Sequence, residues 1–198
     1  IIEQNIDRLS SYGISNFWIS INYLGEQIEN YFKNGKNKDI NIDYVKEDEP
    51  LGTIGAVSKI GKFMHNTVLV TNSDILTDLD YEDFYLNFLE SNADMAVMTI
   101  AFKVDIPYAV MEINNGNINA FREKPTYTYY SNGGIYLIKK ELLGIIPKNR
   151  FYNTTDLLEE LILRDKKVIS YPFAGYWLDI GKHEDFEKAQ IDIKKIKF

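Results

Sequence analysis

The chain alternates between segments with helical spacing of apolar residues and short segments rich in aromatic and β-branched residues. Residues 1–12 have helical spacing and end at Gly13, a residue typical of helix ends. Residues 16–22 are typical of a strand, residues 26–33 return to helical spacing, and residues 40–45 alternate as a strand does. Strands that alternate with helices favour right-handed βαβ units and a parallel sheet.

The second half predicts a hairpin and therefore a mixed sheet. Residues 67–71, TVLVT, are apolar on both faces, as in a buried parallel strand. Asn115-Gly116 is a strong hairpin signal. The other expected elements are helices at 55–61, 80–91, 156–164 and from 183 onward, and strands at 95–102, 110–113, 118–122, 132–138 and 168–173. Asp156 and Glu159 are spaced like a capping box. No linker or repeat divides the chain, so we expect one domain over residues 1–198.

Composition excludes several classes of function. The chain has 198 residues, a net charge of −7 and no cysteine, which excludes a disulfide framework, a zinc finger and a thiol nucleophile. His65 and His183 are too few for a multi-histidine metal site. The acidic balance argues against nucleic-acid binding. No apolar run is long enough to span a membrane, and no signal peptide is present, so we expect a cytoplasmic protein.

Two segments lie where an α/β protein binds ligands. Residues 49–56 form a glycine-bearing turn that opens a helix, although an ordinary turn is the commoner meaning of such a segment. Asp74 directly follows the strand at 67–71, and its carboxylate suits Mg²⁺; a capping role is the alternative. Asp78 and Asp80 have DxD spacing, but a turn and a helix N-cap explain them better.

Three later segments are also candidates. In residues 122–125, REKP, Glu123 could accept hydrogen bonds from sugar hydroxyls and Lys124 could meet a phosphate, or the two could form a solvated surface pair. Residues 132–136, NGGIY, indicate either close approach to a ligand or a β-bulge. Asp179, in an otherwise apolar strand, needs a cation, a donor or a metal, or it caps the last helix.

The order of these five segments is more specific than any one of them. LGTIGA, VLVTNSDI, FREKP, NGGIY and WLDIG resemble, in this order, the motifs of the sugar-1-phosphate nucleotidyltransferase family, of the mannose-1-phosphate guanylyltransferase and glucose-1-phosphate thymidylyltransferase type. The resemblance covers nearly the whole chain. It implies an α/β fold, a three-layer α/β/α sandwich with a mixed, mostly parallel sheet. It also implies the reaction of an NTP with a sugar 1-phosphate to give an NDP-sugar and pyrophosphate.

The resemblance also implies site residues. Asp74 and Asp179 are expected to hold Mg²⁺ at the α-phosphate, and Asp74 and Lys124 to be catalytic. Gly52 and Thr53 are expected to contact the nucleotide base, and Lys124 is expected to contact the sugar phosphate. The sugar is expected to contact Glu123, Asn132 and Gly133. A sugar phosphate is already anionic at neutral pH, so catalysis needs positioning and charge neutralisation rather than a base.

Three departures from the family pattern stand out. Ser73 replaces the glycine that usually precedes the acidic metal ligand, and Ala109 replaces a glycine that approaches the sugar. The family's opening strand and its GxGTRLxPxTxxxPKP segment do not occur, and the chain begins at Ile1 without methionine. No arginine of the chain lies in a matching loop. We therefore expect an N-terminally truncated domain that is weakly active or inactive by itself.

Three functions follow from this sequence. The first is nucleotidyl transfer for surface-polysaccharide precursors, with Mg²⁺, with GTP favoured, and with a hexose or hexosamine 1-phosphate as second substrate. The second is a catalytically silent domain that binds nucleotide or sugar or acts as an interaction module. The third is a DxD-type glycosyltransferase, which rests on Asp78 and Asp80. Nucleic acid and membrane are not expected partners, and a homo-oligomer is left open.

Overall fold

The structure, a computed structural model, describes residues 1–196. Its helical elements follow one another along the chain, with η marking 3-10 helices: α1 (Ile2–Ser11), α2 (Gly25–Phe32), η1 (Lys36–Lys38), η2 (Gly55–Lys59), α3 (Tyr81–Ser91), η3 (Lys140–Ile145), α4 (Thr154–Leu163) and α5 (His183–Asp192). None of these helices is long and apolar enough to cross a membrane.

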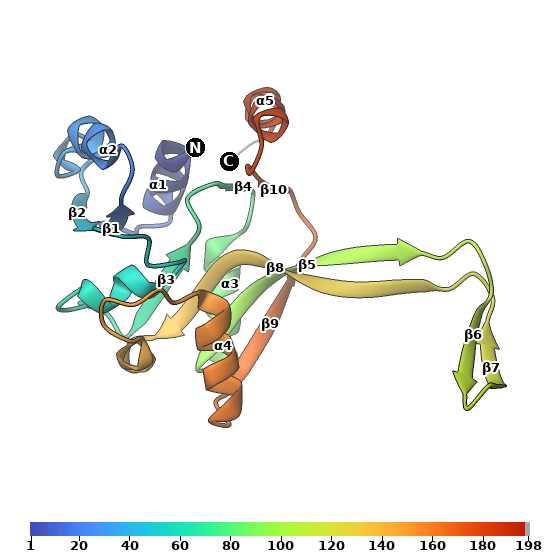
Figure 1. Ribbon diagram of the computed structural model, residues 1–198. Helices are drawn as coiled ribbons and strands as arrows, with labels where there is room; N and C mark the ends of the chain where they lie inside the picture. The colour runs from blue at the N-terminus through green and yellow to red at the C-terminus, as the bar shows by residue number, and fades with distance from the viewer. Residues whose placement is uncertain (197–198) are drawn as a thin grey trace.

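The strands form a mixed set of sheets (Figure 1). They are β1 (Asn16–Ile21), β2 (Asn41–Lys46), β3 (Thr67–Thr71), β4 (Ile75–Thr77), β5 (Met95–Asp105), β6 (Val110–Asn114), β7 (Asn117–Arg122), β8 (Thr126–Lys139), β9 (Val168–Phe173) and β10 (Trp177–Asp179). The largest sheet has the order β3–β8–β5–β9, and β1–β2, β4–β10 and β6–β7 form separate two-stranded sheets. The mixed sheet is thereby confirmed.

Fewer of the strand pairs are parallel than the sequence predicts. Within residues 1–196 the parallel pairs are β1–β2 and β5–β9, and the others are antiparallel. The prediction of a buried parallel strand at β3 is wrong. β3 pairs antiparallel with β8, from Thr67↔Lys139 to Thr71↔Ile135, and its residues are half-buried. Among the described strands β3 has a partner on one side only, which explains the partial burial.

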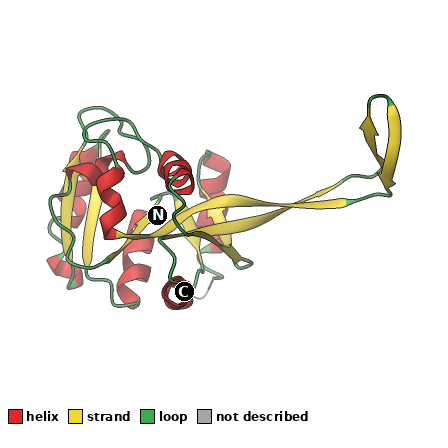
Figure 2. Ribbon diagram, turned by 90° about the horizontal axis from the view of Figure 1, so that it is seen from below, coloured by secondary structure: helices red, strands yellow, loops and turns green. Residues whose placement is uncertain are grey.

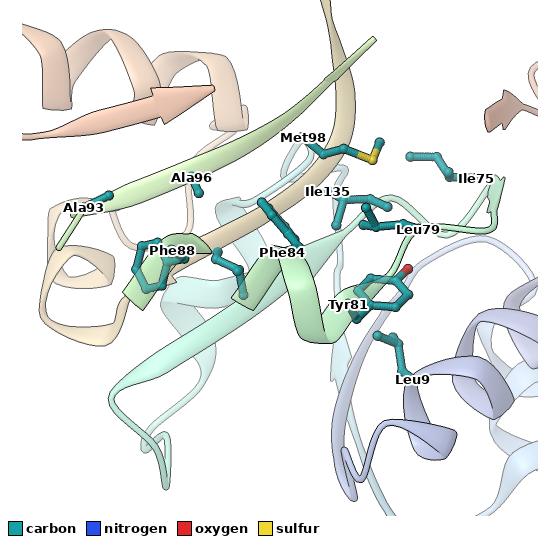
Figure 3. Close-up of a cluster of buried hydrophobic side chains, with 11 residues drawn as sticks. Leu9, Ile75, Leu79, Tyr81, Phe84, Phe88, Ala93, Ala96, Met98 and Ile135 are labelled. Atoms are coloured by element: carbon teal, nitrogen blue, oxygen red, sulfur yellow. The ribbon is translucent and has the colours of Figure 1, made fainter. Parts of the chain in front are cut away.

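Side chains of β5 and β8 alternate between two cores, one on each face of the sheet. The first core faces α1 and α3 and contains Ala96, Met98, Ile135 and Leu137 with Leu9, Phe84 and Phe88 (Figure 3). The second faces η2, η3 and α4 and contains Met95, Val97, Tyr136 and Ile138 with Ile54, Leu142, Leu157 and Leu161. The sheet therefore lies between two helical layers, as a three-layer α/β/α fold requires.

The helix starts are fixed by polar side chains. Asp80 caps α3, since its Oδ1 accepts hydrogen bonds from the backbone N–H groups of Glu82 at 3.0 Å and Asp83 at 3.1 Å. The capping box of α4 lies one turn earlier than predicted. It joins Asn153 to Asp156, whose Oδ2 accepts from the Asn153 backbone N–H at 2.7 Å, so the helix begins at Thr154.

A long two-stranded ribbon leaves the body of the protein. β5 runs to Asp105 and β8 starts at Thr126, both beyond the predicted strand ends at 102 and 132. Together with the β6–β7 hairpin they form a projection that we call the arm, residues 101–131. Figures 1 and 2 show the arm extending away from the body, with the hairpin at its far end.

Candidate active site

Two carboxylates are brought together by the short β4–β10 pair. β10 lies antiparallel to β4, and the register places Asp179 opposite Ile75. The backbone N–H of Ile180 donates to the carbonyl oxygen of Asp74 at 3.0 Å. Asp74 thus sits across the ladder from Asp179, although 105 positions separate the two residues in the sequence.

The electrostatics of this pair are unfavourable for a negative charge. Burial first, and then the carboxylates of Asp74 and Asp185, raise the pKa of Asp179. Such a site gains from a cation placed between the carboxylates. Mg²⁺ is commonly held in proteins by one or two carboxylates, with water and substrate phosphates completing its octahedron.

These two carboxylates suit a metal ion that is also coordinated by the substrate, rather than one that protein side chains coordinate alone. In residues 1–196 no group of three or more His, Cys, Asp or Glu side chains gathers as a metal site. Two exposed carboxylates leave most of the coordination sphere to phosphate oxygens and water. The residues present therefore fit Mg²⁺ bound together with a triphosphate.

The glycine pair of β8 forms a bulge beside these carboxylates. The β5–β8 register passes from Val97↔Tyr136 to Thr99↔Asn132, so the bulge falls on Gly133 and Gly134. The backbone N–H of Gly134, whose φ is +73°, donates to Asn132 Oδ1 at 2.9 Å. A Cβ on Gly133 would lie 2.9 Å from the backbone oxygen of Met98. Of the two interpretations that the sequence allows, the backbone shows the bulge.

Hydrogen bonds tie the bulge to both acidic segments. The indole Nε1 of Trp177, on β10, donates to the carbonyl oxygen of Gly133 at 2.9 Å. The backbone N–H of Asn72, two residues before Asp74, donates to the carbonyl oxygen of Gly134 at 2.9 Å. The segments that carry Asn132, Gly133, Asp74 and Asp179 are therefore connected to one another by hydrogen bonds.

Gly52 and Thr53 meet the start of α4. Gly52 has a φ of +75°, and a Cβ there would lie 2.7 Å from the carbonyl oxygen of Tyr152. Thr53 Oγ1 accepts from the backbone N–H of Thr154 at 2.8 Å and lies 3.0 Å from Thr154 Oγ1. The Thr53 hydroxyl is therefore hydrogen-bonded to the start of α4, although Thr53 itself is exposed.

A buried phenol connects this loop to the bulge. Tyr136 is 3% exposed, and its hydroxyl is hydrogen-bonded to the side chains of Asn132 and Thr154. Burial raises its pKa, against the opposing effect of those two hydrogen bonds. The path Thr53–Thr154–Tyr136–Asn132 thus joins two expected substrate-binding segments through polar side chains.

Tyr136 and Thr154 were not among the residues expected from the sequence. A signal for Tyr136 did exist, because a tyrosine on the inward face of a buried strand needs a partner for its hydroxyl. Thr154 carried no such signal, since its contact depends on where α4 packs.

Glu123 and Lys124 do not join this site. They lie between β7 and β8, in the segment that joins the β6–β7 hairpin to the β5–β8 ribbon (Figures 1 and 2). The six steps along β8 from Thr126 to Asn132 alone cover about 20 Å at the usual rise of a strand. The expectation that these two side chains lie beside Asp74 within one chain is therefore not met, because the continuous β5–β8 ladder holds them away.

The DxD interpretation of Asp78 and Asp80 finds no support in the geometry. Asp80 is the N-cap of α3, and Asp78 Oδ1 accepts from the backbone N–H of Tyr176 at 2.6 Å. Both carboxylates hold backbone in place, as the turn-and-cap interpretation predicted.

Comparisons with known proteins agree with the motif order. The family model described as Nucleotidyl transferase matches residues 1–196. A D-glycero-alpha-D-manno-heptose 1-phosphate guanylyltransferase of Aneurinibacillus thermoaerophilus is 30% identical over 189 residues, which cover 94% of this chain and 81% of that protein. A mannose-1-phosphate guanylyltransferase of Mycobacterium tuberculosis is 29% identical over 197 residues, and the match covers 95% of this chain and 54% of that protein.

A solved structure shares the fold. The crystal structure of HddC from Yersinia pseudotuberculosis superposes with a TM-score of 0.71 at 24% identity, and covers 95% of this chain and 83% of that one. The chain thus spans most of the heptose enzyme's length and about half of the mannose enzyme's.

Proposed function

The chain belongs to the sugar-1-phosphate nucleotidyltransferase family, and we propose that it transfers a nucleotidyl group from an NTP to a sugar 1-phosphate. The observation that carries this proposal is the convergence of Asp74 and Asp179 on the β4–β10 pair, next to the glycine bulge of β8. Relatives named for this reaction support the same conclusion.

The chemistry needs no proton acceptor from the protein. A phosphate oxygen of the sugar 1-phosphate attacks the α-phosphorus of the NTP, and the bond from that phosphorus to the pyrophosphate oxygen breaks. The products are an NDP-sugar and pyrophosphate. Catalysis then comes from holding the two phosphates in line and neutralising their charge. Mg²⁺ held by Asp74 and Asp179 would supply that neutralisation at the α-phosphate.

The remaining residues of the site position the substrates. The bulge at Gly133 and Gly134, next to Asn132, presents backbone groups close to the carboxylate pair, where the sugar is expected. The loop at Gly52 and Thr53 is anchored to α4 and is assigned to the base side. The polar path through Tyr136 keeps the two at a fixed separation.

GTP is the proposed nucleotide, and a hexose, hexosamine or heptose 1-phosphate is the proposed sugar substrate. The names of the two guanylyltransferase relatives favour this choice. The product, an activated sugar, is of the kind used to build surface polysaccharides, and we assign the reaction to the cytoplasm.

Pyrophosphate release tests the proposal. GTP, dTTP, UTP and CTP are each incubated with mannose, glucosamine, glucose and heptose 1-phosphates and Mg²⁺. We expect sugar-dependent release, fastest with GTP. Asp74→Asn should lower the rate about 100-fold or more, because charge stabilisation of several kcal/mol is lost. Asp105→Asn, on the arm, is the matched control and should leave substrate binding at the carboxylate pair unchanged.

A catalytically silent binding domain is the second candidate, favoured by the position of Lys124 beyond the outer end of the β5–β8 ladder. Calorimetric titration separates the two functions. Binding of GTP and sugar 1-phosphate with no pyrophosphate release from any pair would establish the silent domain and contradict the enzyme.

A further inference from the structure

The turn that carries Asp74 is held at three successive residues. The backbone N–H of Asn72 donates to the bulge of β8, and the carbonyl oxygen of Asp74 accepts from Ile180, directly after β10. Between these two contacts, the carbonyl oxygen of Ser73 accepts from the side-chain amide of Asn5, whose Nδ2 lies 3.2 Å away. Asn5 belongs to α1, so the third contact comes from a helix that carries neither a carboxylate of the pair nor the bulge.

Asn5 is a polar residue inside the protein. It is 9% exposed and stands beside the buried residues Ile6 and Leu9 of the same helix. A buried amide costs free energy unless it is hydrogen-bonded, so an apolar side chain would serve better if the position only had to be packed. The amide of Asn5 instead donates to Ser73, which lies 68 positions further along the chain. Asn5 is therefore placed to hold the Asp74 turn.

The Asp74 turn depends on such contacts because packing does not fix it. Ser73 and Asp74 are both exposed. The carbonyl group of Ser73 and the N–H of Asp74 belong to one planar peptide unit, so a hydrogen bond to that carbonyl sets the plane from which the Asp74 side chain departs. Two carboxylates that share one ion must keep their separation, and a displacement of about 1 Å at a reacting centre can cost about 100-fold in rate.

Arg8, also on α1, holds the other end of the β4 segment. Its Nη2 donates to the carbonyl oxygen of Leu79 at 2.6 Å, and its guanidinium carbon lies 5.8 Å and 5.9 Å from the ring centres of Tyr12 and Tyr81. Leu79 follows β4, whereas Ser73 precedes it. Arg8 thus fastens α1 to the same segment at a point away from the turn, which makes it a matched control for Asn5.

We propose that Asn5 is a positioning residue for nucleotidyl transfer, because its amide holds the peptide between Ser73 and Asp74 and thereby keeps the Asp74 carboxylate in place beside Asp179. The inference rests on the proposed function for the role of the carboxylate pair, whereas the contact between α1 and the turn does not depend on it. Asn5 acts through Asp74 and makes no contact with substrate in this account.

Amide hydrogen exchange tests the contact without ligand or turnover. The N–H of Ile180 reports on the turn, because its acceptor is the carbonyl oxygen of Asp74. Relative to the buried Leu137 amide, which tracks global stability, Ile180 should exchange about fivefold faster in Asn5→Leu, a variant of similar side-chain size, and at an unchanged rate in Arg8→Met. Asn5→Ala gives the same test if leucine is not accommodated. Equal protection of Ile180 in the Asn5 and Arg8 variants would overturn the proposal.

The metal dependence of GTP binding tests the positioning role. The dissociation constant of GTP is measured by calorimetry in EDTA and in Mg²⁺, and the ratio of the two values isolates the part of binding that depends on the metal. A general loss of structure weakens both values equally and leaves the ratio unchanged. We expect the ratio to fall about tenfold in Asn5→Leu and to stay within about twofold in Arg8→Met.

Asp74→Asn separates failure of this inference from failure of the proposed function. A ratio that falls in Asp74→Asn and is unchanged in Asn5→Leu would overturn the positioning role and leave the carboxylate pair in place. A ratio that is unchanged in Asp74→Asn itself would contradict the proposed role of the pair and, with it, the positioning role of Asn5, whatever the exchange rate of Ile180.

Discussion

Asp179 is a carboxylate whose folded surroundings disfavour its charge. Burial and the carboxylates of Asp74 and Asp185 raise its pKa above the ordinary 3.8. The folded state therefore takes up this proton more readily than the unfolded state does. Its effect on stability is most favourable below the unfolded pKa and is lost as the pH rises through the raised pKa.

Asp179→Asn should accordingly stabilise the fold while it removes activity. At pH 7 we expect the melting temperature to rise by about 1–2 °C, the size expected for a screened, partly exposed charge. The gain should vanish below pH 3.8, where the carboxyl is protonated. Calorimetric melting at both pH values checks this. Added Mg²⁺ with GTP should raise the melting temperature of the original protein more than that of the variant, and equal shifts would remove Asp179 from the metal site.

Tyr136 is the residue through which the bulge and the Thr53 loop are connected. Tyr136→Phe deletes a hydroxyl bonded to Asn132 and Thr154, and it leaves Thr154, which is 1% exposed, without this partner in the interior. We expect a loss of about 1–2 kcal/mol in the free energy of unfolding. Urea denaturation measures it. Tyr129→Phe, on the exposed arm, is the control and should change stability by less than about 0.5 kcal/mol. Equal effects at the two positions would show that the Tyr136 hydroxyl does not contribute.

The residues of the site differ in how far they could be predicted. Asp74 and Asp179 are predictable because Asp74 directly follows an apolar strand and Asp179 interrupts one. The structure then brings the two together through the β4–β10 pairing. Glu123 and Lys124 match the family motif, yet the long β5–β8 ladder places them away from Asp74 and Asp179. Thr154 could not be found in advance, because its contact with Thr53 spans 101 positions and depends on helix packing.

At the scale of elements, the bulge of β8 is the feature that shapes the site. Gly133→Ala would bring a Cβ into a clash with Met98 Cε and to 2.9 Å from the Met98 backbone oxygen. The side chain can move, but the backbone of β5 cannot. We expect a cost of about 1–3 kcal/mol in folding stability, by denaturant titration, together with weaker sugar-phosphate binding. Gly61→Ala is the matched substitution, because a Cβ there meets nothing within 4 Å. Similar stability losses in the two variants would argue against tight packing at the bulge.

The elements themselves were largely predictable, and their partners were not. Helical spacing located α1, α2 and α3 to within two residues, and Asn115-Gly116 located the β6–β7 hairpin. The sequence predicts β3 as a parallel strand because the residues on both of its faces are apolar. That pattern reports burial on two faces and carries no information on strand direction. The outer parts of β5 and β8 lie beyond the predicted strands, although residues 126–131, TYTYYS, are rich in residues that favour strands.

At the scale of the whole molecule, an anionic α/β/α body carries the two carboxylates and a neutral arm carries the lysine. The layer arrangement followed from the family resemblance and is confirmed by the two cores on opposite faces of β5 and β8. The position of the arm relative to the site could not be predicted from the sequence, because it depends on the twist and the unbroken register of the β5–β8 ladder. The separation of Lys124 from Asp74 is therefore a property of the folded molecule alone.

Isotope transfer tests the central claim most directly, that the Asp74–Asp179 site moves a nucleotidyl group. The protein is incubated with Mg²⁺, sugar 1-phosphate and GTP labelled at either the α- or the γ-phosphate. We predict that α-label appears in a sugar nucleotide and γ-label in pyrophosphate, both only with sugar 1-phosphate present, and that Asp74→Asn and Asp179→Asn each abolish the transfer. Transfer at an unchanged rate in both variants, or α-label that never enters a sugar nucleotide, would contradict the account.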